Sequence, residues 1–130
     1  MITQKLVLVG GAAAGALAVI LGAFGAHALK DRLEPGSLAS FETGVRYQFY
    51  HALALLLIGL LMQFVSASAL RASAVCMIVG TLLFSGSIYL LSTRDLLPLG
   101  EMRFLGPVTP LGGVLLIVGW LLMLMAFLRS

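Results

Sequence analysis

Charge is scarce in this sequence. Asp, Glu, Lys and Arg make up 10% of the 130 residues, whereas 61% are hydrophobic and the mean hydropathy is +1.11. Soluble domains carry about 25% charged residues, which cover their surface. The composition therefore excludes an ordinary soluble domain, and the length predicts a single domain spanning residues 1–130.

Cysteine and catalytic motifs are also nearly absent. The single cysteine, Cys76, cannot form an intrachain disulfide. The sequence contains no Walker loop, no G-x-S-x-G and no H-E-x-x-H motif. Its eight Lys and Arg residues form no basic cluster, which argues against a nucleic-acid partner. These absences favour a protein that is not an enzyme, and no cofactor or metal is assigned from them.

Long apolar runs are the dominant feature that the sequence does contain. Four of them cover about residues 6–29, 49–70, 72–93 and 104–128. A helix of about 20 apolar residues crosses a hydrocarbon layer of about 30 Å. Lipid offers no hydrogen-bond partner to an open backbone, so each run must be helical. The predicted fold class is all-α, an integral membrane four-helix bundle, with membrane lipid as its surroundings.

The first run resembles a secretory signal in part, because Lys5 precedes it and Ala26-His27-Ala28 ends it. A signal core has about 7–15 apolar residues, and this run is much longer. A membrane span is therefore favoured over a cleaved signal.

The segment between the first two spans carries its own pattern. Pro35 is expected to end the first helix near Glu34, and Ser37 to cap a new one. Apolar residues then recur at spacings of three and four, which predicts a short amphipathic interfacial helix between the first and second spans. Those residues are Leu38, Phe41, Val45 and Phe49. Thr109-Pro110 is expected to start the fourth helix as its N-cap and first residue.

The basic residues suggest an orientation. Five of the eight lie in the loops Lys30–Gln48 and Arg94–Thr109, which are predicted to lie on one side of the membrane. The other three lie at the span ends on the opposite side. The positive-inside rule counts Lys and Arg, so it places these two loops in the cytoplasm.

Polar residues near the side of the membrane that holds these two loops form the first candidate site. We expect a polar cluster of His27, Glu42, Arg46, Tyr47 and His51. An alternative is that His27 and His51 face each other across the first helical hairpin and ligate haem. A local hydrogen-bonded role is favoured over a cofactor.

A second candidate is the hydroxyl stripe of Thr81, Ser85 and Tyr89 on the third span. It could line a polar path. The favoured interpretation is that its Ser and Thr hydroxyls bond to carbonyls one turn back in the same helix. Trp120 lies near the middle of the fourth span, where its indole N–H needs a partner.

Small residues predict where helices approach closely. Gly11, Gly15 and Gly22 share one face of the first span, and Gly112 and Gly119 lie on the fourth. Such stripes allow close helix packing in lipid. Packing within one chain is favoured over a dimer face, and a homo-oligomer or a larger membrane complex remains an alternative.

Four separated segments resemble the DUF423 family of small membrane proteins, which includes YgdD-like and YwdK-like bacterial proteins and transmembrane protein 256. They are Gly22-Ala-Phe-Gly-Ala-His-Ala-Leu29, Phe41-Glu-Thr-Gly-Val-Arg-Tyr-Gln-Phe-Tyr-His-Ala-Leu53, Phe84-Ser-Gly-Ser-Ile-Tyr-Leu90, and Thr109-Pro-Leu-Gly-Gly-Val with Gly119-Trp120. The resemblance implies four spans and a place in the bacterial inner membrane. It implies no activity and no catalytic residues.

Three hypotheses about function follow. The favoured one is an accessory or scaffold protein that packs through glycine-rich helix faces. The alternatives are a small transporter or proton-coupled carrier, and a haem-binding electron-transfer protein that uses His27 and His51.

Overall fold

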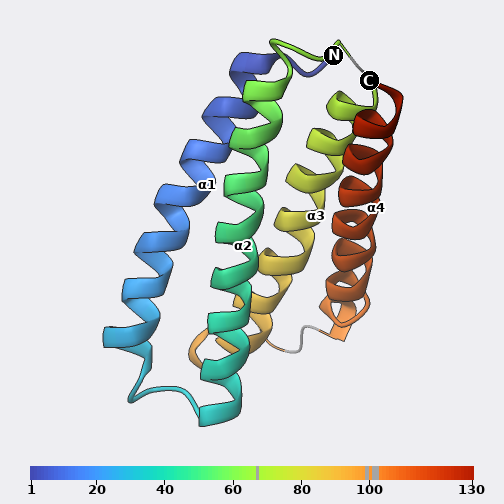
Figure 1. The fold of residues 1–130 in the computed structure, drawn as a ribbon. Helices are drawn as coiled ribbons and strands as arrows, with labels where there is room; N and C mark the ends of the chain where they lie inside the picture. The colour runs from blue at the N-terminus through green and yellow to red at the C-terminus, as the bar shows by residue number, and fades with distance from the viewer. Residues whose placement is uncertain (67, 99, 101–102) are drawn as a thin grey trace.

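The computed structural model describes residues 1–66, 68–98, 100 and 103–130. Its four long helices are α1 (Gln4–Phe24), α2 (Pro35–Leu61), α3 (Ser68–Ser92) and α4 (Val108–Arg129). They run up and down, so that both chain termini lie at one end of the bundle (Figure 1). We call this the terminal end, and the end with the α1–α2 and α3–α4 connections the loop end. All four helices are long and apolar enough to cross a membrane, which confirms the predicted fold class.

The interfacial segment is continuous with the second span. It forms the first turns of α2, which begins at Pro35 and runs unbroken to Leu61. Pro35 occupies the first helical position after Glu34, which has extended backbone (ψ 153°). Ser37 is therefore inside the helix and does not cap it. The predicted end of the second span, residue 70, is wrong, because α2 ends nine residues earlier at Leu61.

The end of the first span agrees with the predicted residue 29, whereas the start of the fourth helix differs from the prediction. α1 ends in a π-helical turn, η1 (Gly25–Leu29), where Gly25 lies against the ring of Phe41. α4 begins at Val108 with Pro107 before it, so Thr109 is not its N-cap. The hydroxyl of Thr109 instead lies 2.5 Å from that of Ser87 on α3. Short 3₁₀ turns, η2 (Arg94–Leu96) and η3 (Arg103–Leu105), lie in the α3–α4 connection.

The helices pack in chain order: α1 along α2, α2 against α3, and α3 against α4. α1 stands at one edge of the bundle (Figure 1). A hydrophobic core lies toward the terminal end and draws on all four helices. Its members are Val7, Ala54, Leu55, Ile58, Leu70, Ala74, Met77, Met123 and Ala126.

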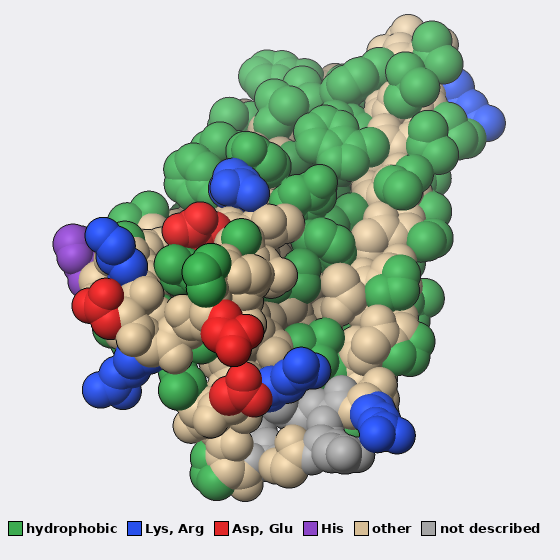
Figure 2. Space-filling view, turned by 90° about the horizontal axis from the view of Figure 1, so that it is seen from below, with side chains coloured by type: hydrophobic (Ala, Val, Ile, Leu, Met, Phe, Trp, Pro, Cys, Tyr) green, Lys and Arg blue, Asp and Glu red, His purple; other side chains and the backbone are tan. Residues whose placement is uncertain are grey.

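Charged side chains are separated from the apolar sides of the bundle. Figure 2 looks onto the loop end, where acidic and basic side chains gather, while hydrophobic side chains cover the flank. Large apolar residues are widely exposed there, for example Leu82 at 68% and Ile117 at 60%. In water this surface would be unfavourable, and in lipid it is the expected covering.

Candidate functional site

Gln48 joins three helices at the centre of the molecule. It lies on α2 and is 7% exposed. Its amide nitrogen donates to the carbonyl oxygen of Ala14 on α1 at 2.8 Å, and its amide oxygen accepts from the Tyr89 hydroxyl on α3 at 2.6 Å. Gln48 was not among the candidate site residues predicted from the sequence. Gln48 is the last residue of the predicted loop, directly before the second apolar run, so its place inside the bundle was not expected.

The hydroxyl stripe of α3 points toward α2. Ser85 donates to the carbonyl oxygen of Gly44 at 2.7 Å, and the Tyr89 ring lies 5.1 Å from that of Phe41. A Cβ on Gly44 would approach the Tyr89 ring to 2.9 Å, so the missing side chain permits this contact. The expected bonding to the preceding turn is therefore wrong for Ser85.

Bonding to the preceding turn does occur nearby, one turn closer to the loop end. Ser92 donates to the carbonyl of Ile88 and Thr93 to that of Tyr89, each at 2.6 Å. Thr81 is the exception in the stripe. Its hydroxyl is buried and has no hydrogen-bond partner within the part of the chain that the structure describes.

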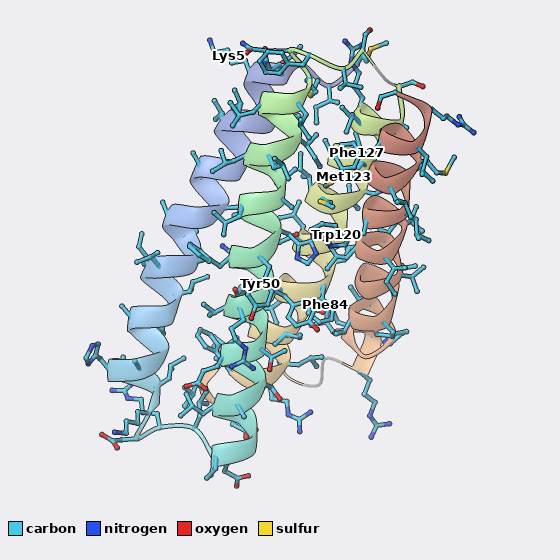
Figure 3. The ribbon with its side chains drawn as sticks, in the orientation of Figure 1. Lys5, Tyr50, Phe84, Trp120, Met123 and Phe127 are labelled. Atoms are coloured by element: carbon cyan, nitrogen blue, oxygen red, sulfur yellow. The ribbon has the colours of Figure 1, made fainter. Side chains whose placement is uncertain are left out.

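His51 is held on both sides of its ring. Nδ1 lies 2.7 Å from the carbonyl oxygen of Tyr47, and Nε2 lies 3.0 Å from the indole nitrogen of Trp120 on α4. A carbonyl only accepts and an indole N–H only donates, so the ring carries its proton on Nδ1 and is neutral. Trp120, midway along the bundle in Figure 3, thereby has the partner that its position required.

The other members of the predicted polar cluster do not gather around His51. His27, Glu42 and Arg46 are exposed, and Arg46 donates to Thr43 at 3.1 Å. Of the predicted cluster, Tyr47 is the member that contacts His51, with ring centroids 6.2 Å apart.

The two histidines are also far apart along the bundle. Gly11 of α1 lies against Ala52, the residue after His51. His27 is sixteen residues further along the chain than Gly11, or about 24 Å of helical rise. The alternative of two facing histidines that ligate haem is therefore wrong, and both ring nitrogens of His51 already have hydrogen-bond partners.

The predicted glycine stripes lie inside the bundle. Gly11, Gly15 and Gly22 face Ala52 and Val45 of α2. On the other side, a Cβ on Gly112 would collide with the backbone of Phe84, and one on Gly119 would meet Met77.

Side-chain hydrogen bonds reinforce these close approaches. Ser73 donates to the carbonyl of Gly119 at 2.6 Å, and Gln4 to that of Gly59 at 2.8 Å. Both bonds join neighbouring helices.

A long groove separates α1 from α3. Its volume is about 550 Å³, its floor is α2, and its wall is almost wholly apolar. The α1 wall runs from Leu6 to Leu21, and the α3 wall from Ile78 to Tyr89. The groove reaches Gln48 and Tyr89, whereas His51 does not line it. Within the described residues, no three His, Cys, Asp or Glu side chains are placed to hold a metal ion.

Comparison with known proteins identifies the family. A family model described as "Protein of unknown function (DUF423)" matches residues 21–113. The chain belongs to the DUF423 family. Relatives of this DUF423 chain include a "UPF0382 membrane protein" of Staphylococcus epidermidis, 40% identical over 97% of the chain and 98% of the relative.

Two further relatives have similar extent. The "UPF0382 membrane protein YwdK" of Bacillus subtilis is 37% identical over 97% of this chain and 98% of its own. "UPF0382 membrane protein SAB0533" of Staphylococcus aureus is 38% identical over 95% of each. No solved structure matches the DUF423 chain. The resemblance to the DUF423 family is thus confirmed. The descriptions of the family and of these relatives name a membrane protein and state no activity.

Proposed function

We propose that this DUF423 protein is a non-catalytic accessory subunit that packs beside another membrane protein, or another copy of itself, in the plane of the membrane. The supporting observation is a second stripe of small residues on α1. Gly11, Gly15 and Gly22 face α2, whereas Ala12, Ala16 and Ala23 are exposed on the other side of the same helix. Small residues four and seven apart allow the close approach on which helix association in lipid depends.

The polar interior supports a static role over transport. The polar side chains of His51, Gln48, Ser85 and Ser73 bond to neighbouring helices or to their own, and these bonds hold the bundle together. A carrier would have to break and remake them in lipid, where each unpaired group costs free energy. The hydroxyl stripe accordingly serves packing in this proposal.

The test uses tagged protein isolated from native membranes in a mild detergent and in nanodiscs. We expect a stoichiometric membrane protein, or a second copy, to co-purify with the wild type. Ala16→Trp should abolish the association, because the larger side chain keeps the partner helix away.

Val114→Trp, on an exposed position of α4, is the matched control and should retain the partner. Recovery of the wild type as a lone monomer under every condition contradicts the proposal. Equal loss of the partner by both variants contradicts the assignment to α1.

We further propose that the loop end faces the cytoplasm of a bacterial inner membrane. The excess of Lys and Arg in its two loops supports this orientation. In a Cys76→Ala background, Ser40→Cys should be protected from a membrane-impermeant maleimide in intact spheroplasts, and Ser66→Cys should be labelled. The reverse pattern contradicts the proposed orientation.

A further inference from the structure

The outer face of α2 carries polar side chains well inside the helix, among them Glu42, Arg46 and Tyr50, all of them exposed. The structure describes α1, α3 and α4 in full, and their exposed residues more than a turn from either end are apolar. Trp120 of α4 is the one of these with a polar group, and its indole N–H already donates to His51. The outer face of α2 is therefore unlike the other lipid-facing surfaces.

Glu42 and Arg46 carry opposite charges, and neither forms an ion pair within the part of the chain that the structure describes. They lie one turn apart on the same helix, yet the guanidinium of Arg46 donates to the hydroxyl of Thr43 at 3.1 Å and not to the carboxylate of Glu42. A guanidinium has five N–H donors, so most of those on Arg46 are still available. Both charges can therefore bind a neighbouring molecule.

Arg46 lies beside the apolar part of α1. Gly22 packs against Val45, so Arg46 is level with a part of α1 about 12 Å of helical rise before Lys30, the first charged residue after that span. Opposite charges attract more strongly there than in bulk water, because the surroundings have a lower dielectric constant. A carboxylate from a neighbouring molecule is therefore a favourable partner for Arg46.

Tyr50 lies deeper than Arg46. It is fifteen residues from Pro35 and eleven from Leu61, and Figure 3 shows it near the middle of α2. Its side chain is 53% exposed, and its hydroxyl has no hydrogen bond within the described residues. Lipid chains offer no partner to a hydroxyl, and an unpaired one costs free energy in an apolar medium. A protein neighbour is therefore favoured over lipid on this face.

The surface beside these residues is hollowed. An open groove of about 470 Å³ runs between α1 and α2, with Gly22 and Ala23 on one side and Arg46, Phe49 and Tyr50 on the other. Ala23 also belongs to the exposed alanines on the outer side of α1. The polar face of α2 and the outer face of α1 thus form one continuous surface.

A second copy of the chain supplies complementary charges at the matching depth. Two copies inserted in the same direction are related by a two-fold axis along the membrane normal, so the same surface of each copy meets that of the other. Glu42 and Arg46 are four residues apart on α2, which is about 6 Å of helical rise. Parallel coiled coils join opposite charges on neighbouring helices in this way. The two-fold axis forms each ion pair twice and brings the Tyr50 hydroxyls to one depth, where each can donate and accept.

We propose that two copies of this protein associate side by side through the outer face of α2, with Glu42 of each copy paired with Arg46 of the other. Apolar contact alone selects no partner in lipid, because lipid chains are as apolar as the helix faces. The charge pairs provide the specificity, since every other alignment of the two copies leaves them unmatched. This inference rests on the accessory role proposed above, and it names a second copy as the partner.

Charge-exchange variants test the pairing with purified protein in liposomes. Arg46→Glu gives every copy two carboxylates on this face and Glu42→Arg gives it two guanidinium groups, so each variant repels itself. We expect each variant alone to lose self-association at least tenfold, whereas a mixture of the two should recover it. Energy transfer between labelled copies measures the association, and recovery in the mixture shows that both variants fold. Asp95→Arg, exposed in the α3–α4 connection, is the control and should associate as the wild type does.

Disulfide crosslinking in native membranes gives a second, separate test. In a Cys76→Ala background, Leu53→Cys on the outer face of α2 should form a dimer on oxidation, whereas Val114→Cys, equally exposed on α4, should not. Equal crosslinking at the two positions overturns the assignment to α2, as does its absence at Leu53→Cys.

The outcomes also separate this inference from the accessory role. A mixture of the charge variants that associates no better than either alone overturns the pairing, because an effect within one helix does not depend on the other variant. A wild type that stays monomeric in liposomes overturns the inference as well. If a different membrane protein still co-purifies with it from native membranes, the accessory role stands and only the second copy is wrong.

Discussion

The indole N–H of Trp120 on α4 donates to Nε2 of His51 on α2 across 3.0 Å, and this bond ties the second helix to the fourth. The two rings meet edge to face, with centroids 5.9 Å apart. α2 and α4 are not adjacent in the chain, and their main packing partners are other helices: α2 packs on α1 and α3, and α4 packs on α3. The bond therefore links α2 directly to α4, and it holds His51 in its neutral form with the proton on Nδ1.

A double-mutant cycle measures this bond. Trp120→Phe leaves Nε2 of His51 without its donor, and His51→Phe leaves the indole without its acceptor. We expect a coupling of about 0.6–2 kcal/mol in the free energy of unfolding, in the range found for hydrogen bonds between membrane helices. Reversible unfolding in mixed micelles gives the four free energies, and strictly additive losses would contradict the bond.

The bond between Tyr89 and Gln48 can be tested by removing one oxygen. Tyr89→Phe deletes a donor to a buried amide oxygen at 2.6 Å and should lower the unfolding free energy by about 1 kcal/mol. Tyr50→Phe is the matched control, because Tyr50 is 53% exposed on the lipid-facing side of α2. Equal effects from the two substitutions would show that ring environment, and not this hydrogen bond, determines the loss.

Ser85 and Thr81 lie one turn apart on α3 and should respond in opposite ways. Ser85→Ala removes a bond to the carbonyl of Gly44 and is expected to destabilise the protein by about 1 kcal/mol. Thr81→Val replaces a buried hydroxyl that lacks a partner, so stability should stay the same or rise. Thermal melting in one detergent ranks the two variants, and a larger loss for Thr81→Val contradicts the arrangement described.

Adjacent glycines on α4 provide the sharpest packing test. Gly112→Ala brings a Cβ into the backbone of Phe84, which cannot move aside as a side chain can, and should cost about 1–3 kcal/mol. Gly113→Ala places its Cβ 3.7 Å from the Phe84 ring, an ordinary contact. Because alanine favours helix over glycine by up to about 1 kcal/mol, Gly113→Ala should be neutral or stabilising. Unfolding midpoints that reverse this order would refute the close α3–α4 contact.

The polar residues show where sequence reasoning reached its limit. The position of Trp120 in the middle of the fourth span indicated that its indole N–H needs a partner, which His51 supplies. The sequence did not indicate that His27, on the π-helical turn Gly25–Leu29, is exposed at the end of α1. Gln48 was missed because its importance depends on Ala14 and Tyr89, which are far from it in the chain.

The sequence by itself determined that four helices cross a membrane and that the chain resembles the DUF423 family. For the four helices, the long apolar runs suffice, because unpaired backbone groups cannot remain in lipid. Tertiary structure alone decided which polar groups meet, where α2 begins and ends, and that α1 stands apart from α3. Large apolar residues lie on both the lipid-facing and the buried faces of these helices, so hydrophobic periodicity alone does not separate the faces. Stripes of small residues indicate which faces pack closely, and the hydrogen bonds of the folded bundle show which helices meet.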